Sequence, residues 1–269
     1  MELITILAIF CLLVVAVAFS PLGLGGGILY VPIMHYMLNW EIKESLVASL
    51  SLVLMVALGS SMAHSKSGYA DPNAAKVGRT YAVPSAILGV ILSGALISSV
   101  GDIGIKIIAS IIIFFVIERT LRKVLSKDDS DSVEVSISEN KSQYIIGSSF
   151  AGLSSGILGI GGGAILVTIN RSILKMDAKK SAGTSYLVAA TVTPVALISH
   201  LLLSRNLSII IDDTGILALI IVPLLVFMSA YFGAKYAIKY LPKHIITIVF
   251  LIVVSISLFR YLIDLISRI

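Results

Sequence analysis

Gly23-Leu24-Gly25-Gly26-Gly27 interrupts a long apolar stretch near the N-terminus, and Gly159-Ile160-Gly161-Gly162-Gly163 repeats the pattern later in the chain. Each glycine in a helix interior costs about 1 kcal/mol relative to alanine, so three consecutive glycines predict a break in a helix. Irregular backbone at membrane depth occurs only where it is buried in protein or lines a wet cavity. The two glycine motifs therefore indicate two interrupted helical elements inside a folded protein.

The composition indicates a protein solvated by a lipid bilayer. Of 269 residues, 57% are hydrophobic and 13% are charged, with a mean hydropathy of +1.02. Soluble domains carry about 25% charged residues, so soluble enzymes, secreted disulfide scaffolds and disordered tails are excluded. Cys11 is the single cysteine and permits no internal disulfide. We therefore expect an all-α polytopic membrane protein.

The positive charge of the chain is spread over short clusters between apolar stretches. The formal net charge is +5. Nucleic-acid binding would need a continuous basic face on a soluble domain, so no nucleic-acid partner is expected. The clusters are better interpreted as signals of membrane topology.

The two halves of the chain are related by an internal duplication. A shift of 136 residues aligns 22–64 with 158–200 and gives thirteen identities in forty-three positions. Val83-Pro84 matches Val222-Pro223 and Gly94-Ala95 matches Gly233-Ala234 at a shift of 139. We predict a first membrane repeat at 1–126, a polar cytoplasmic linker at 127–142 and a second repeat at 143–269.

The distribution of Lys and Arg favours inverted repeats. If each half crossed the membrane four times, the two sides would receive eleven and nine of these residues. If each glycine motif instead tips a hairpin followed by three crossings, the split becomes fifteen to five. The expected hairpin arms are Leu3–Leu22 with Ile28–Trp40, and Gln143–Leu158 with Ala164–Met176. Because cytoplasmic loops are enriched in positive residues, we predict both termini outside and the linker inside.

Equivalent loops carry opposite charge, as inverted repeats require. Glu41-Ile42-Lys43-Glu44 is net negative, whereas Asp177-Ala178-Lys179-Lys180 is net positive. The next pair of equivalent loops also differs in charge. The loop of the first repeat carries the basic residues Lys66, Lys76 and Arg79, whereas that of the second repeat carries Arg205, Asp212 and Asp213. Two parallel four-helix halves remain the alternative, because the charge rule is statistical.

The glycine breaks are candidate anion-binding sites. A break exposes backbone N–H groups at the start of the following helical arm, where the helix dipole is positive. Two such ends converging from opposite faces could hold an anion without a buried cation. The candidate residues are Gly25, Gly26, Gly27, Gly161, Gly162 and Gly163. Close helix packing by small residues is the main alternative, and a dinucleotide-binding loop is disfavoured because no strand precedes either motif.

A polar stripe follows each predicted hairpin. Four side chains of the first stripe fall within an arc of about 100° on a helix; they are Ser45, Ser49, Ser60 and His64. The second stripe contains Ser181, Ser185, Ser199 and His200, with Thr184 at its border. Ser45, Ser49, Thr184 and Ser185 are predicted to complete the hydration shell of an anion. The alternative is that these hydroxyls bond to carbonyls of their own helix.

His64 and His200 occupy equivalent positions in the two repeats. Either could donate a hydrogen bond to an anion or take part in proton coupling, or could merely reach the lipid headgroups. The sequence contains no phosphate-binding loop, no His-Glu-x-x-His motif and no pair of carboxylates within a span. We therefore expect no catalytic residue, no metal and no cofactor, and no enzymatic activity.

These motifs resemble the TauE/SafE sulfite exporter family, also called TSUP. The first repeat has Gly23–Gly27, Pro32, Val47-Ala48-Ser49 and His64-Ser65-Lys66-Ser67-Gly68. The second has Gly159–Gly163, Gly183-Thr184-Ser185 and His200, but Thr168 replaces the proline and the rest of the histidine motif is missing. The similarity covers nearly the whole chain apart from the linker. Related thiosulfate carriers use cysteines along the path, and with only Cys11 here a thiol relay is not expected.

The resemblance implies a secondary transporter or facilitator that exports a small sulfur-containing anion, such as sulfite, a sulfonate or sulfoacetate, across the cell membrane. An importer or proton-coupled carrier of another small anion, or a non-transporting membrane scaffold, are the alternatives. The expected partners are the small anionic substrate and the bilayer, with a homo-oligomer possible.

Overall fold

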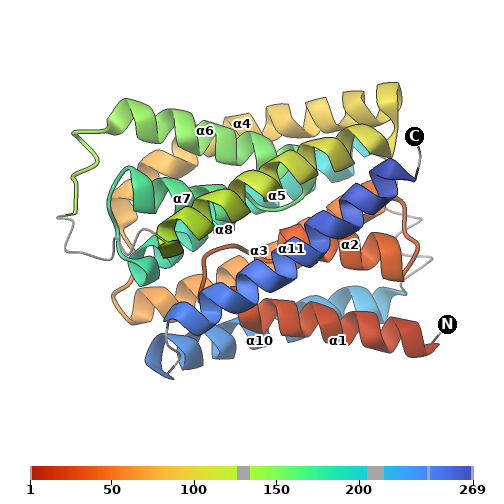
Figure 1. The fold of residues 1–269 in the computed structure, drawn as a ribbon, viewed down its shortest axis with the longest axis horizontal. Coiled ribbons are helices and arrows are strands. Elements are labelled where there is room, and N and C mark those ends of the chain that lie inside the picture. The colour runs from red at the N-terminus through yellow and green to blue at the C-terminus, as the bar shows by residue number, and fades with distance from the viewer. Residues whose placement is uncertain (1, 126–133, 205–214, 241–242, 268–269) are drawn as a thin grey trace.

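The computed structural model describes residues 2–125, 134–204, 215–240 and 243–267, and in these ranges every regular element is a helix. The helices are α1 (Glu2–Phe19), α2 (Gly27–Met37), α3 (Ile42–Lys66), α4 (Pro72–Val100), α5 (Asp102–Leu125), α6 (Lys141–Leu158), α7 (Gly163–Ser172), α8 (Ala178–Ser204), α10 (Ile216–Tyr240) and α11 (Lys243–Ile266). The expected all-α class is confirmed. Figure 1 shows most helices running along the long axis of the molecule.

The helices break where the glycine motifs predict. α1 ends at Phe19 and α2 begins at Gly27, while α6 ends at Leu158 and α7 begins at Gly163. We call residues 20–26 the first glycine loop and residues 159–162 the second glycine loop. Both loops use the left-handed backbone region at equivalent positions, with φ of 82°, 77° and 84° at Gly23, Gly25 and Gly26. The corresponding values in the second loop are 64°, 73° and 69°. Residues with a Cβ rarely adopt this conformation, so glycine is required there.

The arms that follow the glycine loops are too short to cross a membrane. α2 has 11 residues and α7 has 10. At 1.5 Å per residue each arm spans about 16 Å, roughly half of a hydrocarbon core. In Figure 1 the arms of the first hairpin open toward the end of the molecule that carries both termini, and those of the second open toward the opposite end. The inversion of the repeats across a bilayer, with both termini outside, stays a prediction.

Among the residues that the structure describes, four helices are long and apolar enough to cross a membrane: Ile42–Lys66, Pro72–Val100, Ala178–Leu203 and Leu217–Tyr240. They correspond to four of the six crossings that the sequence predicts. α5 and α11 occupy the other two positions with 24 residues each, but they are not among the four. α5 begins with Asp102 and carries Glu118, Arg119 and Arg122 near its end, which limits its apolar length.

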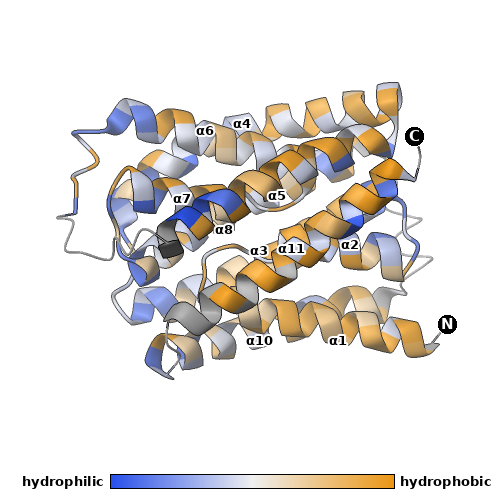
Figure 2. Cartoon of the chain, viewed as in Figure 1, coloured by the Kyte–Doolittle hydropathy of each residue, from blue (hydrophilic) through white to orange (hydrophobic). Residues whose placement is uncertain are grey.

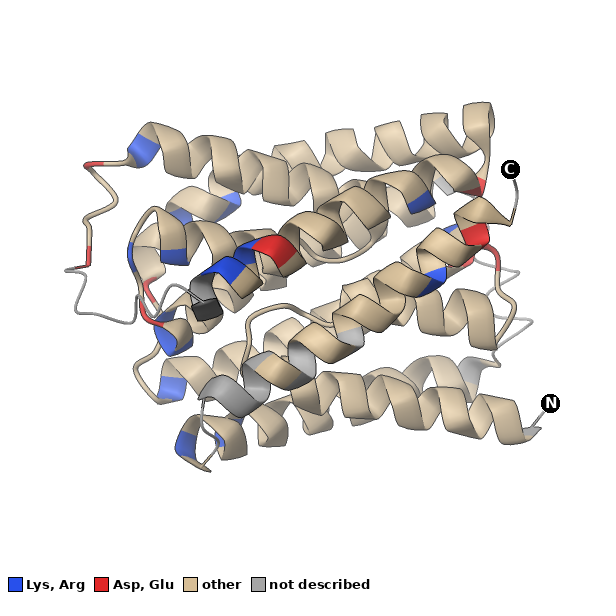
Figure 3. Cartoon of the chain, in the orientation of Figure 1, with Lys and Arg blue, Asp and Glu red and all other residues tan. Residues whose placement is uncertain are grey.

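The surface of the bundle is apolar and its charges lie toward its two ends. Figure 2 shows hydrophobic residues along the outer faces of α1, α10 and α11. Figure 3 shows Lys and Arg gathered mainly toward the end where α5 ends and α6 begins. This is the end that the topology prediction places inside the cell. Of the residues used for that prediction, Lys127, Arg205, Asp212 and Asp213 lie outside the described residues, as does 127–133 of the linker.

The two repeats pack closely against each other. On α6, a Cβ added at Gly152 would lie 2.0 Å from the carbonyl oxygen of Ala82 on α4, and one at Gly156 would lie 2.1 Å from that of Ala86. Small residues let helix backbones approach in this way in membranes. The packing alternative that the sequence left open therefore applies to these glycines of α6.

Candidate functional site

The two glycine loops touch each other inside the bundle. A Cβ added at Gly27 would lie 2.4 Å from the Cα of Ile160, and one added at Gly163 would lie 2.6 Å from the carbonyl oxygen of Gly23. The last glycine of each triplet therefore faces the backbone of the opposite loop. A side chain at either position would force the loops apart, because backbone atoms cannot move aside as a flexible side chain can.

Two equivalent serines join the loops by reciprocal hydrogen bonds. Ser49 Oγ on α3 donates to the carbonyl oxygen of Gly159 over 2.8 Å. Ser185 Oγ on α8 lies 2.8 Å from the carbonyl oxygen of Gly23 and 3.2 Å from that of Gly163. Each serine thus reaches the glycine loop of the other repeat. In this conformation these two of the four predicted substrate hydroxyls are bonded to loop carbonyls.

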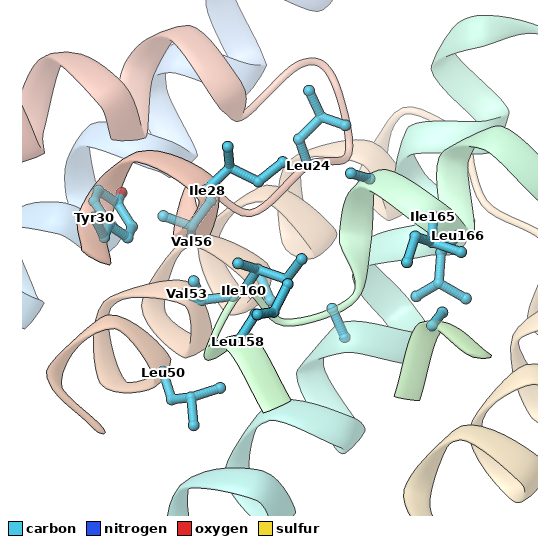
Figure 4. Close-up of a cluster of buried hydrophobic side chains, with 14 of the residues drawn as sticks. Leu24, Ile28, Tyr30, Leu50, Val53, Val56, Leu158, Ile160, Ile165 and Leu166 are labelled. Atoms are coloured by element: carbon cyan, nitrogen blue, oxygen red, sulfur yellow. The ribbon is translucent and has the colours of Figure 1, made fainter. Parts of the chain in front are cut away.

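Apolar side chains fill the space around the contact between the loops. Figure 4 shows Ile160 lying near Ile28 of α2 and Val53 of α3. A Cβ added at Gly25 would lie 3.0 Å from Cγ1 of Val53, and one at Gly161 would lie 2.3 Å from the same atom. A cavity of about 10 Å³, room for roughly one water, borders Gly27 and Ile160. The loops are closed, and a sulfur anion could bind between them only after they separate.

The hydroxyl of Tyr186 lies beside the first glycine loop. This side chain on α8 is fully buried, and its hydroxyl donates to the carbonyl oxygen of Phe19 over 2.6 Å. The backbone of Gly23, Leu24 and Gly25 lies near the same phenol oxygen, as does the side chain of Ser60. Backbone N–H groups gathered around one oxygen atom are also what an anion oxygen requires. The equivalent residue in the first repeat is Leu50, which has no hydroxyl.

The equivalent histidines make different hydrogen bonds. His64 Nδ1 lies 2.9 Å from the carbonyl oxygen of Ser60, whereas His200 Nε2 lies 2.8 Å from that of Gly156. Because a carbonyl oxygen only accepts, the proton is assigned to Nδ1 in His64 and to Nε2 in His200. His64 is fully buried and its Nε2 has no hydrogen-bond partner among the described residues, although the Pro21 carbonyl lies near the ring.

The remaining predicted hydroxyls are buried but lie in different surroundings. Ser45 Oγ has no hydrogen-bond partner among the described residues. Thr184 Oγ1 accepts a hydrogen bond from the backbone N–H of Asp71, the N-cap of α4, over 2.9 Å. The structure thus brings Ser49 and Ser185 to the glycine loops, whereas the Thr184 hydroxyl is engaged at the start of α4.

Comparison with protein-family models gives a match to the sulfite exporter TauE/SafE family over residues 8–261. The chain belongs to the TauE/SafE family. Comparison with characterised proteins and with solved structures gives no match. The predicted resemblance is confirmed, and TauE/SafE proteins are membrane transporters of sulfur anions such as sulfite. Membership of this family implies that the chain is a membrane transporter.

The structure also contains a buried charge cluster that the sequence analysis did not single out. Lys106 on α5 is fully buried, with its Nζ 2.6 Å from Asp102 Oδ2 and 2.5 Å from Asp264 Oδ2 of α11. His35, Asp102 and Asp264 bring three possible metal ligands within 4.8 Å of one another. The Lys106 ammonium already supplies the positive charge between these carboxylates. The available signal was a lysine within an otherwise apolar stretch of the sequence, because charges within membrane spans are rare and functional.

Proposed function

We propose that this protein exports a small sulfur-containing anion, such as sulfite, a sulfonate or sulfoacetate, across the cell membrane. Family membership supports the class of substrate, and the paired glycine loops support the mode of binding. The observation that carries the proposal is the meeting of the two glycine breaks inside the bundle, where α2 begins at Gly27 and α7 begins at Gly163. An anion would lie between these two helix N-termini when the loops separate.

The anion site would form from both repeats, taken as 1–126 and 143–269 joined by the linker at 127–142. The amides of Gly25–Gly27 and Gly161–Gly163 would bind the anion oxygens. The hydroxyls of Ser49 and Ser185 would release the loop carbonyls and donate to the substrate instead. Ser45 Oγ, which is buried without a hydrogen-bond partner among the described residues, would also bind the anion. Alternating access then requires the repeats to rock about the glycine loops.

An inside-negative potential favours export of anions without a coupling ion. One charge that crosses 100 mV changes in free energy by about 2.3 kcal/mol, and a dianion by about twice that. His64 supports a second candidate, a proton-coupled carrier, because its buried Nε2 could accept a proton during the cycle. The two candidates differ in their response to an imposed pH gradient.

The test is a flux assay in proteoliposomes with sulfite, thiosulfate, sulfoacetate and taurine. We expect movement of at least one of these anions, accelerated by an imposed potential and insensitive to a pH gradient. Acceleration by the pH gradient alone would select the proton-coupled carrier. If none of the four anions moves, the proposed function is wrong.

A further inference from the structure

Lys106 is the centre of a charge cluster that joins three helices. Its ammonium contacts Asp102 on α5 and Asp264 on α11. Tyr36 on α2 donates its hydroxyl to Asp264 Oδ2 over 3.3 Å, and the ring of Tyr36 has Arg260 Cζ 4.5 Å from its centroid. We call Tyr36, Asp102, Lys106, Arg260 and Asp264 the charge cluster. It connects the arm that follows the first glycine loop to α5 and α11.

The two ion pairs of Lys106 differ in how they respond to motion. Asp102 lies four residues before Lys106 on the same helix, so this pair persists whatever α5 does. Asp264 lies on α11, so this pair breaks when α5 and α11 separate. The side chains of Asp102 and Asp264 are 25% and 19% exposed, whereas that of Lys106 is 0% exposed. After separation Asp264 could be hydrated, while the buried Lys106 ammonium would keep Asp102 and lose its second carboxylate, whose place another anion could take.

A small apolar cavity lies between the glycine loops and the helices that carry the charge cluster. Gly27 and Ile160 line it where the loops meet, and Ile105 and Ala109 line it along α5. Tyr261 of α11 also lines it, and the ring of Tyr261 packs 6.0 Å from that of Tyr36 in the charge cluster. The cavity, of about 10 Å³, ends at residues next to the charge cluster and would have to widen for an anion to reach Lys106.

The charge cluster has no counterpart in the second repeat. At the shift of 139 residues, Asp102 corresponds to Leu241 and Lys106 corresponds to Ile245. The fold therefore does not require charges at these positions. Because only one repeat carries these charges, they are suited to an event that occurs at one end of the transport path, such as release of the anion.

We propose that Lys106 is an anion-binding residue of the transport path and that its ion pair with Asp264 is the gate. In the closed conformation Asp264 neutralises Lys106. When α11 moves from α5, the transported anion passes from the glycine loops through the cavity and replaces Asp264 on the ammonium. The anion then leaves at the end of the molecule that carries both termini. This inference rests on the proposed function, which supplies the anion.

The gate is tested by thiol labelling, which does not depend on transport. In a Cys11→Ser background, Ala109→Cys places the single thiol in the cavity lining, where Ala109 is 6% exposed. Adding Asp264→Asn should raise labelling by a membrane-impermeant thiol reagent at least about tenfold, because the ion pair between the helices is lost. Asp102→Asn is the matched control, since it leaves the α5–α11 pair, and it should change labelling less than about twofold.

The folded state of each variant is checked by size-exclusion elution and thermal unfolding, and Asp264→Glu should restore protection of the thiol. Equal labelling with and without Asp264→Asn would overturn the gate. The gate would also be overturned if Asp102→Asn raised thiol labelling as much as Asp264→Asn does, because the increase would then follow from the loss of a charge alone.

The anion-binding role is tested by comparing Asp264→Asn with the double variant Lys106→Gln/Asp264→Asn in the sulfite flux assay. Both variants remove the ion pair, but only the first retains the ammonium. The double variant should have a KM for sulfite at least about fivefold higher, with the difference shrinking at high salt. An unchanged KM would overturn the anion-binding role. If the wild type carries none of the anions, the proposed function fails, while the labelling result still decides whether Lys106 and Asp264 form a gate.

Discussion

Ser49 and Ser185 make the same hydrogen bond in opposite directions across the molecule. Ser49 donates to the carbonyl of Gly159, and Ser185 donates to the carbonyl of Gly23, each over 2.8 Å. The two serines are 136 residues apart, as are the two glycines. This reciprocal pair ties each glycine loop to a helix of the other repeat.

Ser49→Ala and Ser185→Ala should each destabilise the closed loops. Each substitution leaves a buried carbonyl without its donor, which costs about 1–3 kcal/mol. Thermal unfolding in detergent measures the loss. Ser51→Ala is the control, since Ser51 Oγ bonds to the Ala48 carbonyl of its own helix and is only half-buried. Equal effects of all three substitutions would contradict a special role for the loop bonds.

Gly27→Ala and Gly163→Ala should abolish most of the sulfite flux. The added Cβ atoms meet the opposite glycine loop at 2.4 and 2.6 Å, and such overpacking costs about 1–3 kcal/mol. Gly94→Ala is the matched control in α4, where an added Cβ meets no atom within 4 Å. We expect normal flux for the control. A scaffold that does not transport would tolerate all three substitutions in its own function.

Tyr186→Phe should raise the apparent affinity for the anion while lowering the stability of the empty protein. The phenol hydroxyl donates to the Phe19 carbonyl beside the backbone of the first glycine loop. Its loss leaves this buried carbonyl without a donor, at a cost of about 1–3 kcal/mol, and uncovers the loop amides. Equilibrium binding of sulfite and thermal unfolding measure the two effects.

Tyr144→Phe is the control for Tyr186→Phe, because Tyr144 is equally buried but donates to the side chain of Asn170, 3.0 Å away. It should lower stability without changing affinity. If Tyr186→Phe weakens binding, the hydroxyl is itself a ligand of the anion and does not stand in its place.

Cysteines at Lys43 and Lys179 should label from opposite faces of the membrane. Lys43 lies at the start of α3 and Lys179 at the start of α8, which are equivalent positions in the two repeats. The experiment uses single cysteines in a Cys11→Ser background and an impermeant reagent on intact cells. Labelling of both from the same face would require parallel repeats.

Local backbone chemistry and composition made much of the fold predictable from the sequence. Apolar stretches specify helices in lipid, and glycine triplets break them because a residue without a Cβ is needed for positive φ. The breaks after Phe19 and Leu158 therefore followed from the residues nearby. The duplication was equally visible, since it is a property of the order of residues.

Contacts between residues distant in the chain decided the rest. The sequence placed Ser49 and Ser185 on suitable faces, but only packing shows that they bond to the opposite loops. Tyr186 was missed because its partners lie more than 160 residues earlier. Lys106 and Asp264 are 158 residues apart and pair only because α5 and α11 lie together. Helix formation depends on neighbours within a few residues, whereas these pairs depend on how the helices pack, which no local pattern encodes.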